Sequence, residues 1–85
     1  MIANNFSEIF KKIGLKIKLL RIERKISQQD LAAACNFEKS NLARIEAGRT
    51  NPTVATLLKI CQVLDVSTSQ LFDFEDTENH NEVKE

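Results

Sequence analysis

The chain has 85 residues, of which 42% are hydrophobic and 28% are charged. This length allows one domain with a modest core, and no apolar run reaches the roughly 18 residues that a membrane-spanning helix needs. The first residues, MIANNFSEIFKK, lack the uninterrupted apolar region and small-residue cleavage site of a signal peptide, so we expect a cytoplasmic protein without a membrane association.

The formal net charge is zero, but the charges are unevenly distributed. Residues 1–49 carry ten Lys or Arg against five acids, a balance of +5, and residues 50–85 carry two Lys against seven acids, a balance of −5. A nearby phosphate backbone responds to the charges within a Debye length of about 10 Å rather than to the net charge of the whole chain. The basic half is therefore a candidate surface for nucleic acid, although a solvated helix face would give the same counts.

A first helix is expected after a flexible segment, residues 1–6, with Ser7 as its cap and its end near Arg24 or Lys25. Apolar residues recur along it at helical spacing and predict its core-facing side: Phe6, Phe10, Ile13, Ile17 and Leu20. A second stripe on another side consists of Leu15, Leu19 and Ile22. This second stripe either widens the buried surface or contacts another protein.

Two short amphipathic helices with a tight turn between them are predicted for residues 27–49. Ser27 is a good cap for the first helix, whose apolar face consists of Leu31, Ala32 and Cys35. Asn36 tolerates a left-handed backbone and ends this helix. The second helix is expected from Lys39 to Ala47, with Gly48 as its stop and with an apolar face of Leu42, Ala43 and Ile45.

Two more helices complete the expected chain. Thr53 caps a fourth helix with an apolar stripe of Val54, Leu57, Leu58, Cys61 and Leu64. Ser67 with Gln70 forms a capping-box pattern for a short fifth helix that carries Leu71 and Phe72. Residues 75–85 are mostly acidic or amide and are expected to be disordered. Short connections between amphipathic helices predict a compact all-α five-helix bundle.

The spacing within residues 13–72 resembles the helix-turn-helix of the Cro and phage-repressor family, often called the XRE-like family. The residues that carry the resemblance are Gln28, Leu31, Ala32, Cys35, Asn36, Leu42, Ile45, Glu46, Gly48, Pro52, Leu57, Leu58 and Leu64. The resemblance implies a lambda-repressor-like DNA-binding domain over residues 7–74. Two residues depart from the family pattern: Asn36 stands where glycine is usual, and Glu38 stands where Ser or Thr often caps the second helix of the motif.

The resemblance also implies which side chains contact DNA. The helix that begins at Lys39 would enter the major groove, where Arg and Lys suit guanine and Asn or Ser suit adenine or either base. The candidate base contacts are Lys39, Ser40, Asn41 and Arg44. The candidate phosphate contacts, which fix position rather than sequence, are Ser27, Gln28, Lys16, Lys18, Arg49 and Asn51.

Two structural roles follow from the same resemblance. Arg21 and Glu46 are expected to form a partly buried ion pair between the first and third helices. A dimer interface is expected at the apolar C-terminal residues, which are Val66, Leu71, Phe72 and Phe74. The stripe of Leu15, Leu19 and Ile22 is the competing surface for this interface.

The resulting hypothesis is a sequence-specific DNA-binding transcriptional regulator that acts as a homodimer on a palindromic operator, similar to stand-alone restriction-modification controller proteins. The alternative is an antitoxin or protein-interaction adaptor with autoregulatory DNA binding and a protein partner of unknown identity. No catalytic constellation, metal set or phosphate loop is present, so neither an enzyme nor a cofactor is expected. Cys35 and Cys61 are expected to be buried and reduced, with a disulfide or redox sensor as the alternative.

Overall fold

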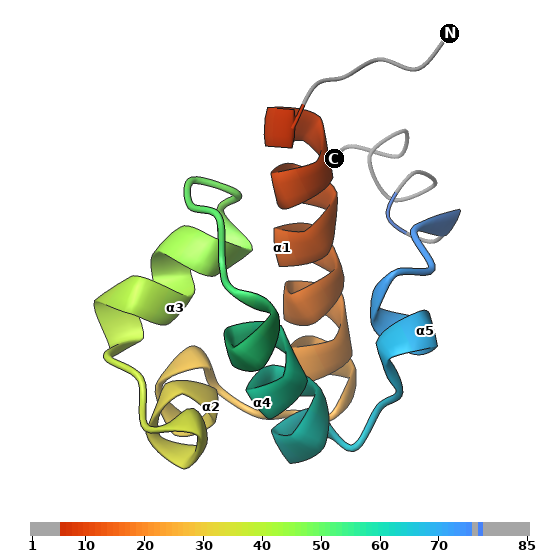
Figure 1. Cartoon of the computed structure of the whole chain (residues 1–85). Coiled ribbons are helices and arrows are strands. Elements are labelled where there is room, and N and C mark those ends of the chain that lie inside the picture. The colour runs from red at the N-terminus through yellow and green to blue at the C-terminus, as the bar shows by residue number, and fades with distance from the viewer. Residues whose placement is uncertain (1–5, 76, 78–85) are drawn as a thin grey trace, which may run out of the picture.

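The computed structural model describes residues 6–75 and residue 77 of the chain. Regular structure in this part is helical, as the sequence predicts. Five helices follow one another along it: α1 (Phe6–Glu23), α2 (Gln28–Cys35), α3 (Lys39–Glu46), α4 (Val54–Leu64) and α5 (Thr68–Leu71) (Figure 1). Within the described residues, no helix is both long and apolar enough to cross a membrane.

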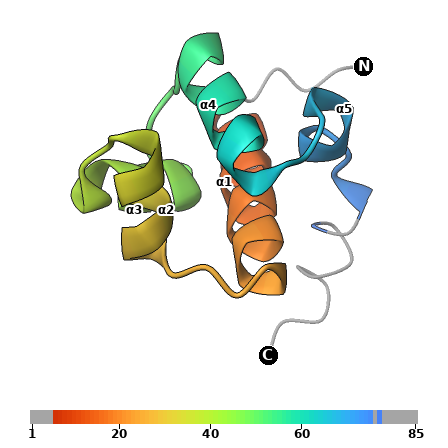
Figure 2. The same cartoon turned by 90° about the horizontal axis from the view of Figure 1, so that it is seen from below.

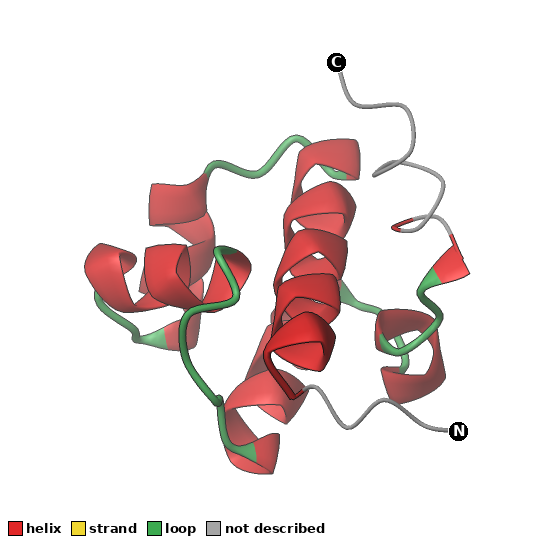
Figure 3. Cartoon of the chain, turned by 90° about the horizontal axis from the view of Figure 1, so that it is seen from above, coloured by secondary structure: helices red, strands yellow, loops and turns green. Residues whose placement is uncertain are grey.

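Helix α1 is the central element of the bundle. Helices α2 and α3 lie on one side of α1 and α5 lies on the other, while α4 packs against α1, α2 and α5 (Figures 1 and 2). Short loops join all five helices (Figure 3). The core between them is formed by thirteen buried residues: Ile13, Ile17, Leu20, Leu31, Ala32, Cys35, Leu42, Ile45, Leu57, Ile60, Cys61, Leu64 and Leu71.

Three helices begin at the caps that the sequence predicts. The Ser27 hydroxyl accepts a hydrogen bond from the Asp30 N–H at 2.9 Å, and the Thr53 hydroxyl accepts one from the Thr56 N–H at 3.1 Å. Ser67 forms the predicted capping box with Gln70. These bonds satisfy N–H groups that have no partner within their own helix.

Two helix starts differ from the prediction. Helix α1 already begins at Phe6, so Ser7 is its second residue rather than its cap. Glu38 occupies the cap position of α3 with an extended backbone, but its side chain makes no capping hydrogen bond. The Glu side chain is one methylene longer than Asp, which is the carboxylate that commonly caps helices. Helix α3 therefore begins at Lys39 without a side-chain cap.

The packed domain continues past Phe74. Thr77 is fully buried, and its hydroxyl donates a hydrogen bond to the Phe74 carbonyl oxygen at 2.7 Å. The prediction that disorder begins at residue 75 is therefore wrong at this boundary, because Glu75 and Thr77 are helical. The rest of the expected tail, residues 76 and 78–85, and residues 1–5 of the expected flexible start lie outside the described residues.

Candidate nucleic-acid interface

Helices α2 and α3 form a helix-turn-helix with a sharp left-handed turn. Asn36 adopts the left-handed conformation, with φ 62° and ψ 38°, as its residue type predicts. The Phe37 N–H donates to the Ala32 carbonyl oxygen at 2.8 Å and closes the turn. Leu31 and Leu42 are fully buried, so both helices are fixed to the core through their apolar faces.

The four candidate base-contacting side chains, Lys39, Ser40, Asn41 and Arg44, are all exposed on α3. Successive residues are about 100° apart around a helix, which places Ser40, Arg44 and Asn41 in that order around α3, with about 40° between Ser40 and Arg44 and about 60° between Arg44 and Asn41. Lys39 lies about 100° from Ser40, on the side away from Asn41. The exposed face is therefore centred on Ser40 and Arg44, with Lys39 at one edge and Asn41 at the edge toward the start of α4.

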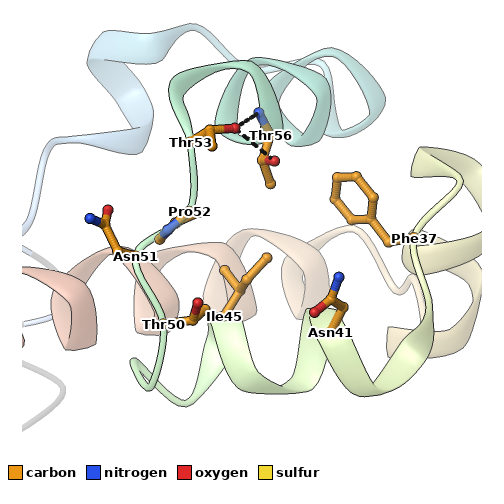
Figure 4. Close-up of a pocket in the computed structure, with 8 residues that line it drawn as sticks. All are labelled: Phe37, Asn41, Ile45, Thr50, Asn51, Pro52, Thr53 and Thr56. Carbon is orange, nitrogen blue, oxygen red and sulfur yellow. Dashed lines mark hydrogen bonds between the residues drawn. The ribbon is translucent and has the colours of Figure 1, made fainter.

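Asn41 borders a hollow of about 180 Å³ between α3 and the beginning of α4 (Figure 4). Its wall also contains Asn51, one of the candidate phosphate contacts, together with hydroxyl groups and three apolar side chains. The lining residues are Phe37, Asn41, Ile45, Thr50, Asn51, Pro52, Thr53 and Thr56. This hollow places Asn41 beside the α3–α4 loop.

Arg21 and Glu46 form the expected ion pair between α1 and α3. The Arg21 Nε and Nη2 atoms donate to the two carboxylate oxygens of Glu46 at 2.7 and 3.0 Å, and both side chains are largely buried. Arg21 Nη1 also donates to the Ile26 carbonyl oxygen at 3.0 Å. Glu46 accepts a third hydrogen bond from Gln28, whose Nε2 lies 2.9 Å from Glu46 Oε1. The planar fork of the guanidinium makes this contact directional.

The contact with Glu46 gives Gln28 a role that sequence reasoning missed. Gln28 is the candidate phosphate contact at the start of α2, and it also donates a hydrogen bond to Glu46 at the end of α3. Lys18 lies next to this network and lines, with Arg21, Gln28 and Glu46, a shallow hollow of about 330 Å³. Ser27, Lys18 and Arg49 are exposed, and Gln28 is half-buried. These candidate phosphate contacts thus remain accessible at the surface.

Lys16 does not belong to this surface, contrary to the sequence-based prediction. Its exposed fraction is only 7%. Lys16 lies two residues from Lys18, which places it about 200° away around α1 and away from the side that faces α3. Helical rotation therefore separates two lysines that are close in the sequence, and only Lys18 remains a candidate for phosphate contact.

Comparison with known proteins places this geometry in a family. Residues 17–71 match the protein-family model HTH_3, described as helix-turn-helix. The chain belongs to this helix-turn-helix family. The immunity repressor protein of Bacillus phage phi105 is 39% identical over 69% of the chain, which spans 41% of that repressor. The HTH-type transcriptional regulator y4dJ of Sinorhizobium fredii is 38% identical over 72% of the chain and 79% of the regulator.

A solved structure agrees with the family. The restriction-modification controller protein C.Esp1396I, solved as a tetramer in complex with its natural 35-base-pair operator, is 31% identical to this chain. The TM-score is 0.70, and the match covers 76% of this chain and 86% of the controller protein. The expectation of a phage-repressor-type helix-turn-helix fold is confirmed.

The apolar residues outside the core of this helix-turn-helix protein differ from those expected. Leu71 is fully buried, so it is not available to the predicted dimer interface. Val66 and Phe74 are half-buried, and Phe72 is exposed with its ring centroid 6.0 Å from that of Phe74. Two residues of the predicted α4 core stripe, Val54 and Leu58, are instead exposed, since the core uses Ile60 on the opposite side of α4.

The two cysteines are free and buried. Burial raises the pKa of both thiols, and the nearby Lys59 partly opposes this increase in the pKa of Cys35. Such thiols are predominantly protonated and unreactive at neutral pH. In the part of the chain that the structure describes, no cluster of three His, Cys, Asp or Glu side chains could hold a metal ion.

Proposed function

We propose that this chain is a cytoplasmic, sequence-specific DNA-binding transcriptional regulator that acts as a homodimer on a palindromic operator. The observation that carries the proposal is the exposed face of α3, where Lys39, Ser40 and Arg44 are exposed after the tight turn at Asn36. A helix of this kind fits the major groove, and its first residues reach the base edges.

The surroundings of α3 support binding to a phosphate backbone on both sides of the groove. On one side lie Ser27, Gln28 and Lys18, and on the other lie Arg49 and Asn51 in the loop before α4. Contacts from both sides would fix the register of α3 while leaving the choice of sequence to its exposed face. Because Arg49 and Lys18 are exposed cations, we expect binding to weaken steeply between about 50 and 200 mM salt.

The relatives support the regulatory part of the proposal. The phage phi105 relative is named an immunity repressor, and the C.Esp1396I relative was solved as a tetramer on its operator. One domain of this size contacts few base pairs, and pairing about a two-fold axis places two recognition helices about 34 Å apart, one turn of DNA. A homodimer would double the number of base contacts.

The proposed dimer surface combines predicted and newly found residues. Phe72, Phe74 and Val66 remain candidates, and the exposed Val54 and Leu58 on α4 extend the apolar area. Leu58 and Val66 line one hollow of about 490 Å³. The competing surface on α1 has only one strongly exposed apolar residue, Ile22, since Leu15 and Leu19 are half-buried.

Selection of bound sequences from random DNA, followed by sedimentation of the complex, tests the proposal. We expect an enriched palindromic site that binds two chains. Phe72→Ser combined with Leu58→Ser should give a folded monomer that binds the selected site weakly. Recovery of no preferred sequence would contradict the function, and a dimer that persists in this double variant but dissociates with Leu19→Glu would move the interface to α1.

A further inference from the structure

Gly14 is an unusual residue at its position, because it lies in the interior of α1. Glycine destabilises a helix interior relative to alanine, since it loses more backbone freedom on folding and has no side chain to pack. The residue is buried, so exposure to a ligand does not explain its presence. The explanation lies in the element that packs against it, which is the end of α3.

The backbone of α1 touches the last carbonyl groups of α3 at Gly14. A Cβ atom at this position would lie 2.3 Å from the Ile45 carbonyl oxygen and 2.5 Å from the Glu46 carbonyl oxygen. Ordinary carbon–oxygen contacts are about 3.3–3.6 Å, so any other residue at position 14 requires a movement of roughly 1 Å. The obstructing atoms belong to the backbone and cannot rotate away as a side chain would.

A second glycine, Gly48 just after α3, approaches α1 equally closely at Lys11, one turn before Gly14. A Cβ atom on Gly48 would lie 2.6 Å from the Lys11 Cα atom, and Gly48 has a positive φ of 74°. Lys11, Gly14 and Arg21 recur at three- and seven-residue spacing, so they share one face of α1. The end of α3 is therefore held on α1 at three points: the Gly48–Lys11 contact, Gly14, and the Arg21–Glu46 ion pair.

We infer that Gly14 is a positioning residue for DNA recognition, in addition to its contribution to packing. This inference rests on the proposed function. The side chains of Lys39 and Ser40 lie at the start of α3, and Arg44 lies in its last turn, next to the end of the helix that is fixed on α1 at Gly14. A shift of this fixed end by about 1 Å changes the tilt of α3 and misaligns hydrogen bonds to base edges, which require distances of about 2.7–3.2 Å. Contacts with phosphates are less demanding, because they depend on charge.

The experiment compares wild-type protein with the Gly14→Ala variant at a temperature where circular dichroism shows both to be folded. Binding is measured on the site selected by the wild type and on an unrelated duplex of the same length. We expect Gly14→Ala to lower the ratio of specific to non-specific affinity by about 10- to 100-fold, the loss of one or two base contacts. Non-specific affinity should change less than threefold, and the amide NMR shifts that move should be centred on residues 38–48.

Ile60→Val is the matched control, because it weakens the core in α4 without touching the α1–α3 contact. It should lower the melting temperature and preserve the affinity ratio. Where Gly14→Ala does not fold, Gly48→Asn tests the same contact, since Asn tolerates positive φ and adds a Cβ atom against Lys11.

The outcomes separate this inference from the proposed function. A wild-type protein without any preferred sequence would contradict the proposed function itself. A selective wild type with an equally selective Gly14→Ala variant would overturn the positioning role. Loss of folding in both glycine variants would also overturn it, because the two glycines would then serve packing alone.

Discussion

The two sides of α1 are held by different kinds of contact. On the α3 side, the contact consists of backbone atoms at Gly14 and Gly48 and of the hydrogen-bonded carboxylate of Glu46. On the α5 side, Leu71 is fully buried among apolar residues of the core, and the neighbouring Phe72 and Phe74 rings pack edge to face. The first contact is directional, whereas the second depends mainly on buried area.

This difference matters because only one side holds a helix that would read bases. Apolar cores tolerate substitutions that conserve volume, so we expect the α5 contact to survive conservative changes. Backbone contacts and a bidentate ion pair fix both distance and orientation. We therefore expect conservative substitutions to have large effects on the α3 side and small effects on the α4–α5 side.

Glu46→Gln should cause the largest loss of stability. The substitution keeps the shape of the side chain but removes the charge that Arg21 and Gln28 contact, and Arg21 remains largely buried. Stranding one member of a buried pair costs about 3 to 5 kcal/mol. Urea denaturation should show this loss for Glu46→Gln and about 0.5 to 1.5 kcal/mol for the conservative core change Ile60→Val.

The matched control for Glu46 is Glu23, which pairs with Arg24 at 3.5 Å on the surface. Glu23→Gln should change the free energy of unfolding by less than about 1 kcal/mol, because an exposed pair is well solvated. Similar losses for Glu46→Gln and Ile60→Val would show that the two sides do not differ in the way described above.

Arg44→Ala should have the largest effect on recognition. Loss of one base contact should cost about 1 to 3 kcal/mol on the selected site and relax the preference at one base pair. Gln28→Ala should weaken all sequences similarly, and it should also lower stability because Glu46 loses a donor. Titrations against single-base variants of the site measure both effects, and a uniform loss for Arg44→Ala would exclude its base-reading role.

Local signals in the sequence predicted much of the fold. Ser27, Thr53 and Ser67 are strong cap residues, and each caps the predicted helix. Asn36 turns the chain as its residue type predicts. Glu38 was less predictable, because a side chain that can cap a helix does so only when its length and rotamer allow the bond. Asp65 also adopts the left-handed conformation at the end of α4, which Asp, like Asn, tolerates better than most residues.

Long-range packing explains the features that the sequence did not predict. Lys16 lies at the edge of the predicted core stripe of α1, three residues after Ile13 and four before Leu20, and the packed structure covers it. The four residues of α5 are too few to show by their own pattern that Leu71 would be covered. The apolar stripe predicted for α4 included Val54 and Leu58, but the packed structure leaves both exposed. Apart from the expected Arg21–Glu46 pair, a glycine inside a long amphipathic helix was a signal for the α1–α3 contact, since such a residue often has a packing reason.

Two left-handed residues allow a matched test of the helix ends. Asn36 ends α2 beside the recognition helix, and Asp65 ends α4 beside α5, with φ of 62° and 60°. Alanine at either position should cost about 1 to 2 kcal/mol in thermal unfolding, because its Cβ atom is crowded in this conformation. Only Asn36→Ala should also reduce discrimination between DNA sites, since its turn positions α3. Reduced discrimination in both variants would argue against separate roles for the two sides.

The smallest expected effect concerns the thiols, one in each region. Because burial raises the pKa of Cys35 and Cys61 in the folded chain, both thiols remain protonated after the unfolded chain has begun to ionise. Their contribution to stability is therefore complete below the ordinary thiol pKa and decreases as pH rises above it. Between pH 8 and about 9.5, we expect a loss of less than about 1 kcal/mol per thiol in urea denaturation. Cys61→Ala and Cys35→Ala should each remove part of this loss. Equal losses in the wild type and both variants would show that other groups titrate in this range.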